Sequence, residues 1–134
     1  MPLDVAVVTP EREVWSGEAT FVIARSEGGD LGILPGLAPF LGALHHARLI
    51  VEQGDVQTYI AVHGGFIEVF KDRVSVLTEV AEPAEEIDIE RARRQREEAE
   101  AAVAREDTEE NRAALLRATN RLQTAAESGI LGIG

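Results

Sequence analysis

Three arginines in the last quarter of the sequence have the residue type and spacing for binding anions. Arg112, Arg117 and Arg121 lie in the run 111–126, which contains no acidic residue. Because Arg117 and Arg121 are four positions apart, a helix would place both guanidinium groups on one face, where they could bind a phosphate or a partner's carboxylates. Spacing alone leaves open an alternative, a solvated face whose arginines pair with acidic residues of the preceding segment: Glu97, Glu98 and Glu100.

The histidines are weaker candidates for chemistry. The chain has three of them, His45, His46 and His63. A metal site needs three or four converging ligands, whereas adjacent residues in a strand point to opposite faces. No nucleophile-elbow motif and no phosphate-binding loop is present. We therefore expect no catalytic residue and no metal site; the enzyme alternative, a small jelly-roll enzyme that uses the three histidines, predicts metal in the purified protein.

Composition narrows the possible functions further. The 134 residues include no cysteine, which removes disulfides, thiolate nucleophiles and cysteine-ligated zinc together. The net charge of −11 opposes unaided binding to nucleic acid or to an anionic membrane surface. No apolar run approaches the roughly 20 residues of a membrane span, and no leader segment is evident. We expect a soluble protein with no nucleic-acid partner and no direct membrane insertion.

The chain up to about Thr78 has the pattern of short β-strands. Its apolar residues alternate or form short blocks rich in Val, Ile, Phe and Thr, and glycine- or aspartate-containing turns separate these blocks. We predict two packed antiparallel sheets, a β-sandwich, with hairpins at Gly54-Asp55 and Lys71-Asp72. The predicted strands are 3–8, 14–24, 49–52, 56–62, 66–70 and 74–77. The side chains expected in the core or at its rim are Trp15, Phe21, Phe40, Phe66, Ile67, Val69 and Leu77.

The C-terminal part is rich in Ala, Arg, Glu and Leu, which is typical of helices. Asp88 is the predicted N-cap of a helix that runs to about Arg105. Asp107 or Thr108 is the predicted cap of a second helix, which ends at Ser128-Gly129. The short connection predicts an antiparallel helical hairpin. The ion pairs expected on the first helix are Glu90/Arg94, Arg93/Glu97, Arg94/Glu98 and Arg96/Glu100.

The predicted seam between the two helices consists mostly of alanine, which buries little area, so the hairpin is weakly held. Residues 79–86 are acidic, contain a proline and are predicted to form a hinge. The sequence thus divides into a β-sandwich domain, 1–84, and a helical hairpin domain, 85–134. The apolar end, 129–134, is expected to be a flexible tail. The seam residues are Ala92, Ala99, Ala102 and Val103 facing Leu115, Ala118, Leu122 and Ala125.

The segment 28–40 combines glycines and prolines with apolar residues, which fixes the shape of the backbone rather than its chemistry. It predicts short extended pieces joined by two sharp turns, forming a surface that meets a partner. Together with Trp15-Ser16-Gly17, the run 62–69 and the order of sandwich and hairpin, this segment resembles the epsilon subunit of F-type rotary ATP synthases. The match over 29–39 is specific, although Leu37 stands where the family usually has histidine.

The resemblance implies a non-catalytic subunit of the central stalk, which couples the gamma subunit to the ring of c subunits. It also implies a hairpin that switches between a folded state and an extended state, in which it reaches the alpha and beta subunits and inhibits ATP hydrolysis. The expected location is the cytoplasmic face of a bacterial cell membrane, as a peripheral part of the complex. The implied contacts with the ring and gamma are Asp30, Leu31, Gly32, Pro35 and Leu37, and those with beta are Arg112, Arg117 and Arg121.

Some bacterial members of this family hold the folded hairpin with ATP, through a motif that this chain matches at 87–92. ATP is thus an expected regulatory ligand, no cofactor is required, and the dependence on magnesium stays open. An alternative function is a free-standing nucleotide-sensing module, which predicts ATP binding without association with gamma. The residues that the resemblance assigns to ATP are Glu82, Ile87, Asp88, Arg91, Ala92, Arg117 and Arg121.

Overall fold

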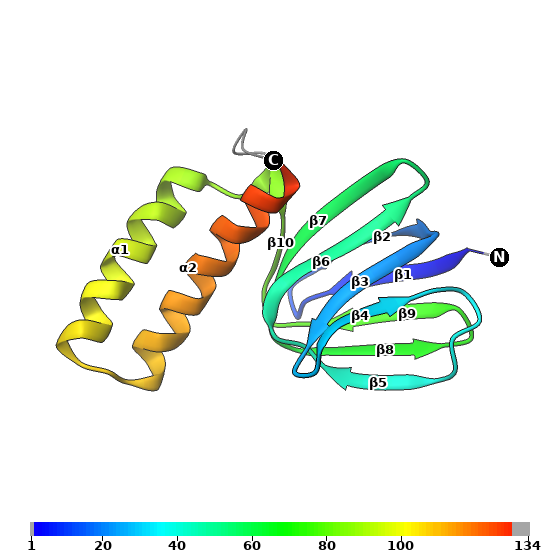
Figure 1. Cartoon of the computed structure of the whole chain (residues 1–134), viewed down its shortest axis with the longest axis horizontal. Coiled ribbons are helices and arrows are strands. Elements are labelled where there is room, and N and C mark those ends of the chain that lie inside the picture. The colour runs from blue at the N-terminus through cyan, green and yellow to red at the C-terminus, as the bar shows by residue number, and fades with distance from the viewer. Residues whose placement is uncertain (1, 130–134) are drawn as a thin grey trace.

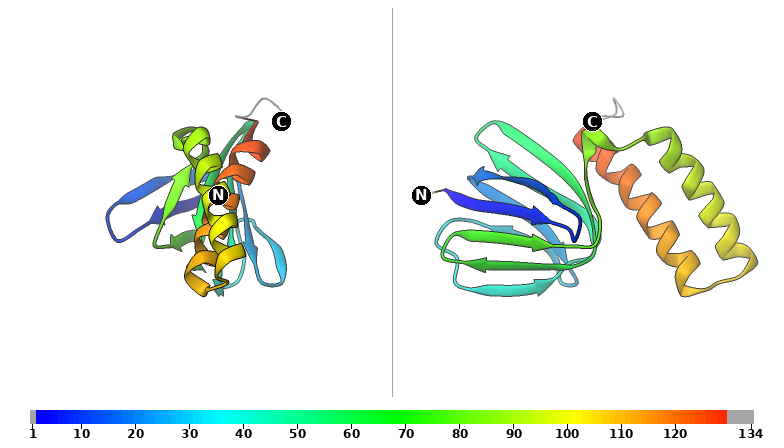
Figure 2. Two further views of the ribbon diagram at one scale, coloured as in Figure 1. Left: turned by 90° about the vertical axis from the view of Figure 1, so that its left-hand side faces the viewer. Right: turned by 180° about the vertical axis from the view of Figure 1, so that it is seen from behind.

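A β-sandwich followed by two helices makes up the computed structural model, which describes residues 2–129. The two sheets stack face to face, and the helical hairpin stands beside one of them (Figure 1). Helix α2 lies between the sandwich and α1, so α1 is the outermost element (Figure 2). The fold predicted from the sequence is confirmed. Most of the expected flexible tail lies outside the described residues.

Each sheet has five strands. The first has the order β2-β1-β9-β8-β5, and the second has the order β10-β7-β6-β3-β4. All strand pairs are antiparallel except β1 with β9, which run parallel. The strands are β1 Leu3–Val8, β2 Glu13–Ala19, β3 Phe21–Ser26, β4 Gly29–Ile33, β5 Phe40–Ala43, β6 His46–Gln53, β7 Val56–His63, β8 Phe66–Phe70, β9 Arg73–Leu77 and β10 Ala81–Pro83.

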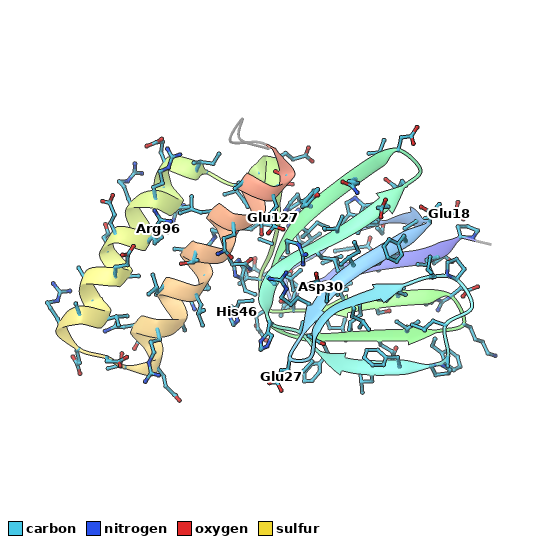
Figure 3. The ribbon with its side chains drawn as sticks, viewed as in Figure 1. Glu18, Glu27, Asp30, His46, Arg96 and Glu127 are labelled. Atoms are coloured by element: carbon cyan, nitrogen blue, oxygen red, sulfur yellow. The ribbon has the colours of Figure 1, made fainter. Side chains whose placement is uncertain are left out.

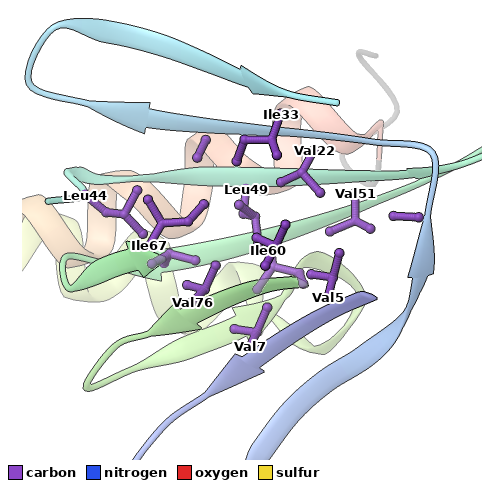
Figure 4. Close-up of a cluster of buried hydrophobic side chains, with 14 of the residues drawn as sticks. Val5, Val7, Val22, Ile33, Leu44, Leu49, Val51, Ile60, Ile67 and Val76 are labelled. Atoms are coloured by element: carbon purple, nitrogen blue, oxygen red, sulfur yellow. The ribbon is translucent and has the colours of Figure 1, made fainter. Parts of the chain in front are cut away.

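The core lies between the sheets and consists of aliphatic side chains from both inner faces (Figure 4). In β8, Ile67 and Val69 point inward and are buried, as predicted. Phe66 and Leu77 do not belong to the core: they are cross-strand partners on the outer face, 56% and 51% exposed. Their placement follows from the two-residue period of a strand, because burial of Ile67 in β8 and of Val76 in β9 turns Phe66 and Leu77 outward. Trp15 and Phe40 pack against the core from its rim.

Two segments form strands whose boundaries were not predicted. The block 14–24 is not one strand: it changes sheet near Thr20, so that β2 and β3 belong to different layers. The glycine-rich segment supplies β4 and β5, and the loop between them turns at Gly36, whose φ of +88° favours glycine. The Gly36 amide donates a hydrogen bond to the Asp72 carboxylate (2.7 Å), which ties this loop to the β8–β9 turn.

Both predicted hairpin turns are confirmed. Gly54 lies in the β6–β7 turn with φ of +65°. Lys71 and Asp72 form the β8–β9 turn, and both have positive φ, 48° and 62°. Positive φ at both central residues is the geometry of a two-residue turn that matches the twist of the flanking strands.

The helices begin and end close to the predicted residues. Helix α1, Ile89–Arg105, is capped by the Asp88 side chain, which accepts a hydrogen bond from the Arg91 amide (3.0 Å). Of the two predicted caps for α2, Glu109–Ser128, Thr108 is the one used, and Gly129 ends the helix with φ of +86°. Of the four predicted ion pairs only Arg96–Glu100 forms among the described residues, and Glu90 pairs with Arg93 instead of Arg94.

Residues 79–86, the predicted hinge, contain regular secondary structure. Strand β10 pairs with β7 and buries Ala81 and Pro83, and a short 3-10 helix, η1 Ala84–Glu86, follows it. The prediction missed this strand because a three-residue acidic stretch with a proline has no alternating apolar pattern. Pro83 is the last residue of β10, at an edge of the sheet, where a missing amide hydrogen breaks no pairing between central strands.

Candidate functional site

Polar contacts, here called the docking seam, join α2 to the outer face of the second sheet. Asn120 is one of its most buried polar groups, at 3% exposed. Its Nδ2 donates to the carbonyl oxygen of Val62 (3.0 Å) and lies 3.3 Å from His63 Nδ1. Its Oδ1 accepts a hydrogen bond from Thr124 Oγ1 (3.2 Å). The docking seam comprises Asn120, Arg121, Thr124 and Glu127 of α2 with Arg48, Val62, His63 and Glu82 of the sheet.

The Asn120 network fixes the orientation of the His63 ring hydrogen. Because the Val62 carbonyl needs a donor and Thr124 supplies one, the Asn120 amide group must face His63 with its nitrogen. His63 Nδ1 is then the acceptor, and the ring hydrogen lies on Nε2. That atom is buried without a hydrogen-bond partner, 3.6 Å from Glu82 Oε1. His63 therefore faces α2 through one nitrogen and β10 through the other.

Glu82 is the acidic centre of the docking seam. The Arg121 guanidinium donates a hydrogen bond through Nε to Glu82 Oε1, so an ion pair connects α2 with β10. The neighbouring His63 ring and the Arg121 guanidinium outweigh burial and lower the pKa of Glu82 from 4.5 to about 2. The 3.6 Å separation makes the His63 contribution an attraction across a gap, whereas Arg121 makes the direct bond.

Acid should weaken the structure through Glu82. A carboxyl group whose pKa is lowered on folding contributes stability that is present above its ordinary pKa of 4.5 and is lost as the pH falls through about 2. We expect Glu82→Gln to lower the free energy of unfolding at pH 6 by about 1–3 kcal/mol, and the difference from wild type to shrink progressively from pH 4.5 to pH 2. Urea unfolding of both proteins at a series of pH values measures this difference, and a difference independent of pH would contradict it.

Arg48 forms the second ionic part of the docking seam. Its side chain is 8% exposed, and two of its nitrogens, Nη1 and Nη2, each lie 3.3 Å from an oxygen of Asp30. Its Nε donates to Glu127 Oε1 near the end of α2 (3.2 Å). Asp30 also accepts a hydrogen bond from Arg25 Nε (3.1 Å). The Arg48 and Arg25 guanidinium groups together lower the pKa of Asp30. Figure 3 shows Asp30 on the side of the sandwich that faces the hairpin, and Glu127 near the end of α2.

Only some of the residues predicted to bind ATP lie around one cleft. A cleft of about 350 Å³ opens between β10, the start of α1 and the middle of α2, and Glu82, Asp88, Arg91 and Arg121 line it. Arg117 lines a neighbouring groove between the two helices, which shares Arg121 with the cleft. Two other predicted residues, Ile87 and Ala92, are buried and line neither hollow.

The three arginines of the acid-free run occupy different environments. Arg112 is exposed and pairs with Asp107 (2.7 Å) at the far end of the hairpin. Arg121 pairs with Glu82, and Arg117 has no ion pair among residues 2–129. None of the three pairs with the first helix, which the alternative interpretation required. Arg117 therefore lines the groove between the two helices without a carboxylate partner among the described residues.

The residues of the glycine-rich segment that are predicted to contact the ring or gamma lie in two different places. Asp30 and Gly32 point to the outer face of the second sheet, whereas Leu31 packs against the core. Pro35 and Leu37 are exposed in the loop after β4, at the other end of that strand. The segment therefore offers a carboxylate beside the hairpin and an apolar loop away from it.

The histidines do not converge. His46 and His63 have ring centroids 5.9 Å apart, but His45 is exposed and lies outside β6. Burial, and after it the nearby His63, lowers the pKa of His46. Within residues 2–129, no group of three or more His, Cys, Asp or Glu side chains could hold a metal ion.

An exposed apolar face covers the outer side of β5, β8 and β9. Four large apolar side chains on three paired strands are more than half exposed, and the exposed Glu68 lies between two of them on β8, opposite Leu41. We call these residues the apolar face: Leu41, Phe66, Phe70 and Leu77. Alternation along β8 could have revealed this face, since Ile67 and Val69 already accounted for the buried side.

Both the β-sandwich and the helical hairpin have counterparts in known proteins. The model of the ATP synthase delta/epsilon chain, β-sandwich domain, matches residues 2–84. The chain belongs to the ATP synthase delta/epsilon family. The ATP synthase epsilon chain of Streptomyces coelicolor is 46% identical over 125 residues, which cover 92% of this chain and 95% of that relative. The epsilon chain of Thermobifida fusca is 46% identical over 129 residues, 92% of this chain and 91% of its own.

Solved structures support the fold of this epsilon-family chain, hairpin included. A chain of the Euglena gracilis mitochondrial ATP synthase superposes with a TM-score of 0.72, covering 96% of this chain and 81% of that one at 23% identity. The resemblance inferred from the sequence is confirmed at the level of the family. No helix within residues 2–129 is long and apolar enough to cross a membrane.

Proposed function

We propose that this chain is the epsilon-type subunit of a bacterial F-type ATP synthase. Its sandwich couples gamma to the ring of c subunits, and its hairpin is a regulatory element that inhibits ATP hydrolysis when it leaves the sandwich. The subunit itself catalyses nothing. It is placed peripherally at the cytoplasmic face of the membrane by its partners, since its net charge of −11 opposes direct binding to an anionic surface.

The apolar face is the observation that best supports a stalk role. Leu41, Phe66, Phe70 and Leu77 lie on a rigid sheet, more than half exposed, and large exposed apolar patches mark protein interfaces. A contact that transmits rotation must resist deformation, and a paired sheet backed by a close-packed core does so better than a loop. We assign this face to the contact with gamma. We assign Asp30, and the loop with Pro35 and Leu37 at the other end of β4, to contacts with the ring.

Charge placed in the apolar face should prevent assembly with gamma. We expect Phe66→Asp to lower co-purification with gamma at least tenfold, because burying an unpaired carboxylate in an interface costs several kcal/mol. Leu116→Asp is the matched control, since Leu116 is 52% exposed but lies on α2. Equal recovery of gamma with both variants would contradict the assignment, and absence of gamma with the wild-type chain would favour a free-standing module.

The cleft beside the docking seam supports regulation by ATP. It brings the cationic side chains of Arg91 and Arg121 together with the carboxylates of Glu82 and Asp88, between two elements that separate if the hairpin leaves. Cations suit the phosphates, and carboxylates can accept hydrogen bonds from ribose or adenine. A ligand that binds only the docked state stabilises it by RT ln(1 + [L]/Kd), so falling ATP would release the hairpin.

Arg91 provides a sharp test of nucleotide binding. Its guanidinium has no ion pair among the described residues and lines the cleft, whereas Arg93, on the same helix, pairs with Glu90 and does not line it. We expect Arg91→Ala to weaken ATP binding by about 10-fold or more, as for a lost charge-assisted hydrogen bond, and Arg93→Ala to leave it unchanged. Calorimetric titrations with and without magnesium measure both. Equal affinities, or no binding by wild type, would contradict an ATP site here.

A further inference from the structure

Arg48 links a proposed ring-contact residue with the hairpin. It lies on β6, in the middle of the second sheet, and its register partner on β7 is Ala61. Both residues are on the face that α2 covers. The nearly buried Arg48 guanidinium divides its donors between Asp30 of β4 and Glu127 of α2. Two carboxylates from separate parts of the molecule thus share one cation.

Sharing one cation makes the two carboxylates compete. Asp30 and Glu127 carry like charges, and each reduces the attraction that Arg48 can offer to the other. Arg25 is a second cation at Asp30, whereas the ion pair of Glu127 is with Arg48 alone among the described residues. Loss of the negative charge at Asp30 therefore strengthens the contact between α2 and the sheet. Without Glu127, Arg48 would interact with Asp30 alone of these two carboxylates.

We propose that Arg48 couples the occupancy of Asp30 to the docking of the hairpin. A polar or cationic group of a partner that engages Asp30 releases Arg48 to Glu127 and holds α2 against the sheet. By reciprocity, departure of the hairpin leaves Asp30 more strongly neutralised by Arg48 and less available to the partner. The role of the ring as that partner rests on the proposed function; the coupling between the three side chains does not.

Docking can be measured with one introduced thiol, because the sequence contains no cysteine. Ala61 is fully buried on β7 under α2, so in an Ala61→Cys chain the rate of thiol modification reports how often α2 leaves the sheet. The substitution adds one sulfur atom to an otherwise intact full-length chain.

The test compares charge removal at Asp30 with charge removal elsewhere. In the Ala61→Cys chain, we expect Asp30→Asn to slow thiol modification about threefold, in the range of a partly exposed ion pair. In the Glu127→Gln background the same change should have no effect. Glu68→Gln, which removes one exposed carboxylate from the other sheet, is the matched control and should also have no effect.

Faster or unchanged modification with Asp30→Asn would overturn the coupling, as would an equal slowing in the Glu127→Gln background. The isolated chain is used without gamma or the ring, so a negative result leaves the proposed function in place. Failure of the wild-type chain to bind gamma would conversely refute the proposed function and leave the coupling intact.

Discussion

Replacement of Gly65 by alanine should destabilise the sandwich more than any other single glycine substitution. A Cβ at this position would overlap the carbonyl oxygen of Leu77 and approach Thr78 Cα to 2.9 Å. The backbone also has φ of +106°, which side chains rarely adopt. Because the obstacle is backbone of the paired strand β9 and its continuation, neither side can yield cheaply. We expect a loss of about 3 kcal/mol or more in the free energy of unfolding.

Gly29→Ala separates the two causes of that loss. Gly29 has a similar φ, +114°, but nothing lies within 4 Å of the position that its Cβ would take. Alanine there should cost about 1–2 kcal/mol from backbone strain alone. Urea unfolding of both variants measures the difference. Equal losses would show that Leu77 moves aside freely, contrary to a rigid junction between β8 and β9.

Loss of the Asn120 side chain should release the hairpin. Asn120→Ala leaves the buried Val62 carbonyl and His63 Nδ1 without their donor, and each unsatisfied buried group costs about 1–3 kcal/mol. We expect thiol modification in the Ala61→Cys chain to accelerate about 30-fold or more. The cost falls on docking rather than on the sandwich core, because Asn120 contacts only the outer face of the sheet.

Asn111→Ala is the matched control for Asn120. Asn111 belongs to the same helix, but its side chain donates to the carbonyl oxygens of Ala102 and Glu106 at the far end of the hairpin. Its removal should loosen the connection between the helices and leave the modification rate at position 61 unchanged. Similar acceleration with both variants would mean that any weakening of α2 exposes the sheet, and the docking seam would lose its special role.

Local signals predicted much of the fold. Asp88 and Thr108 stand directly before helical runs with side chains that can cap them, and Lys71-Asp72 lies between two alternating segments. Each of these features depends on residues close together in the sequence, so it forms largely independently of tertiary contacts. Strand β10 lacked such a signal, because its order comes from pairing with β7 rather than from its own sequence.

The site was less accessible to sequence reasoning. The alanine stripe predicted one buried face for α2, but this helix has two, one against α1 and one against the sheet. Asn120 and Thr124 lie on the second face, four residues apart, and looked like ordinary polar positions. Arg48 likewise gave no signal, because its partners Asp30 and Glu127 are 18 and 79 residues away in the chain. Contacts of that kind become visible only when the fold brings the segments together.

The most direct test of the account is ATP hydrolysis by a complex depleted of this chain and then reconstituted with the full chain or with residues 1–86. The shorter chain retains every strand of the sandwich and lacks both helices. We predict that both forms bind, and that hydrolysis at low ATP is lower with the full chain because its released hairpin blocks the catalytic subunits. Equal hydrolysis with the two forms would contradict a regulatory role for the hairpin.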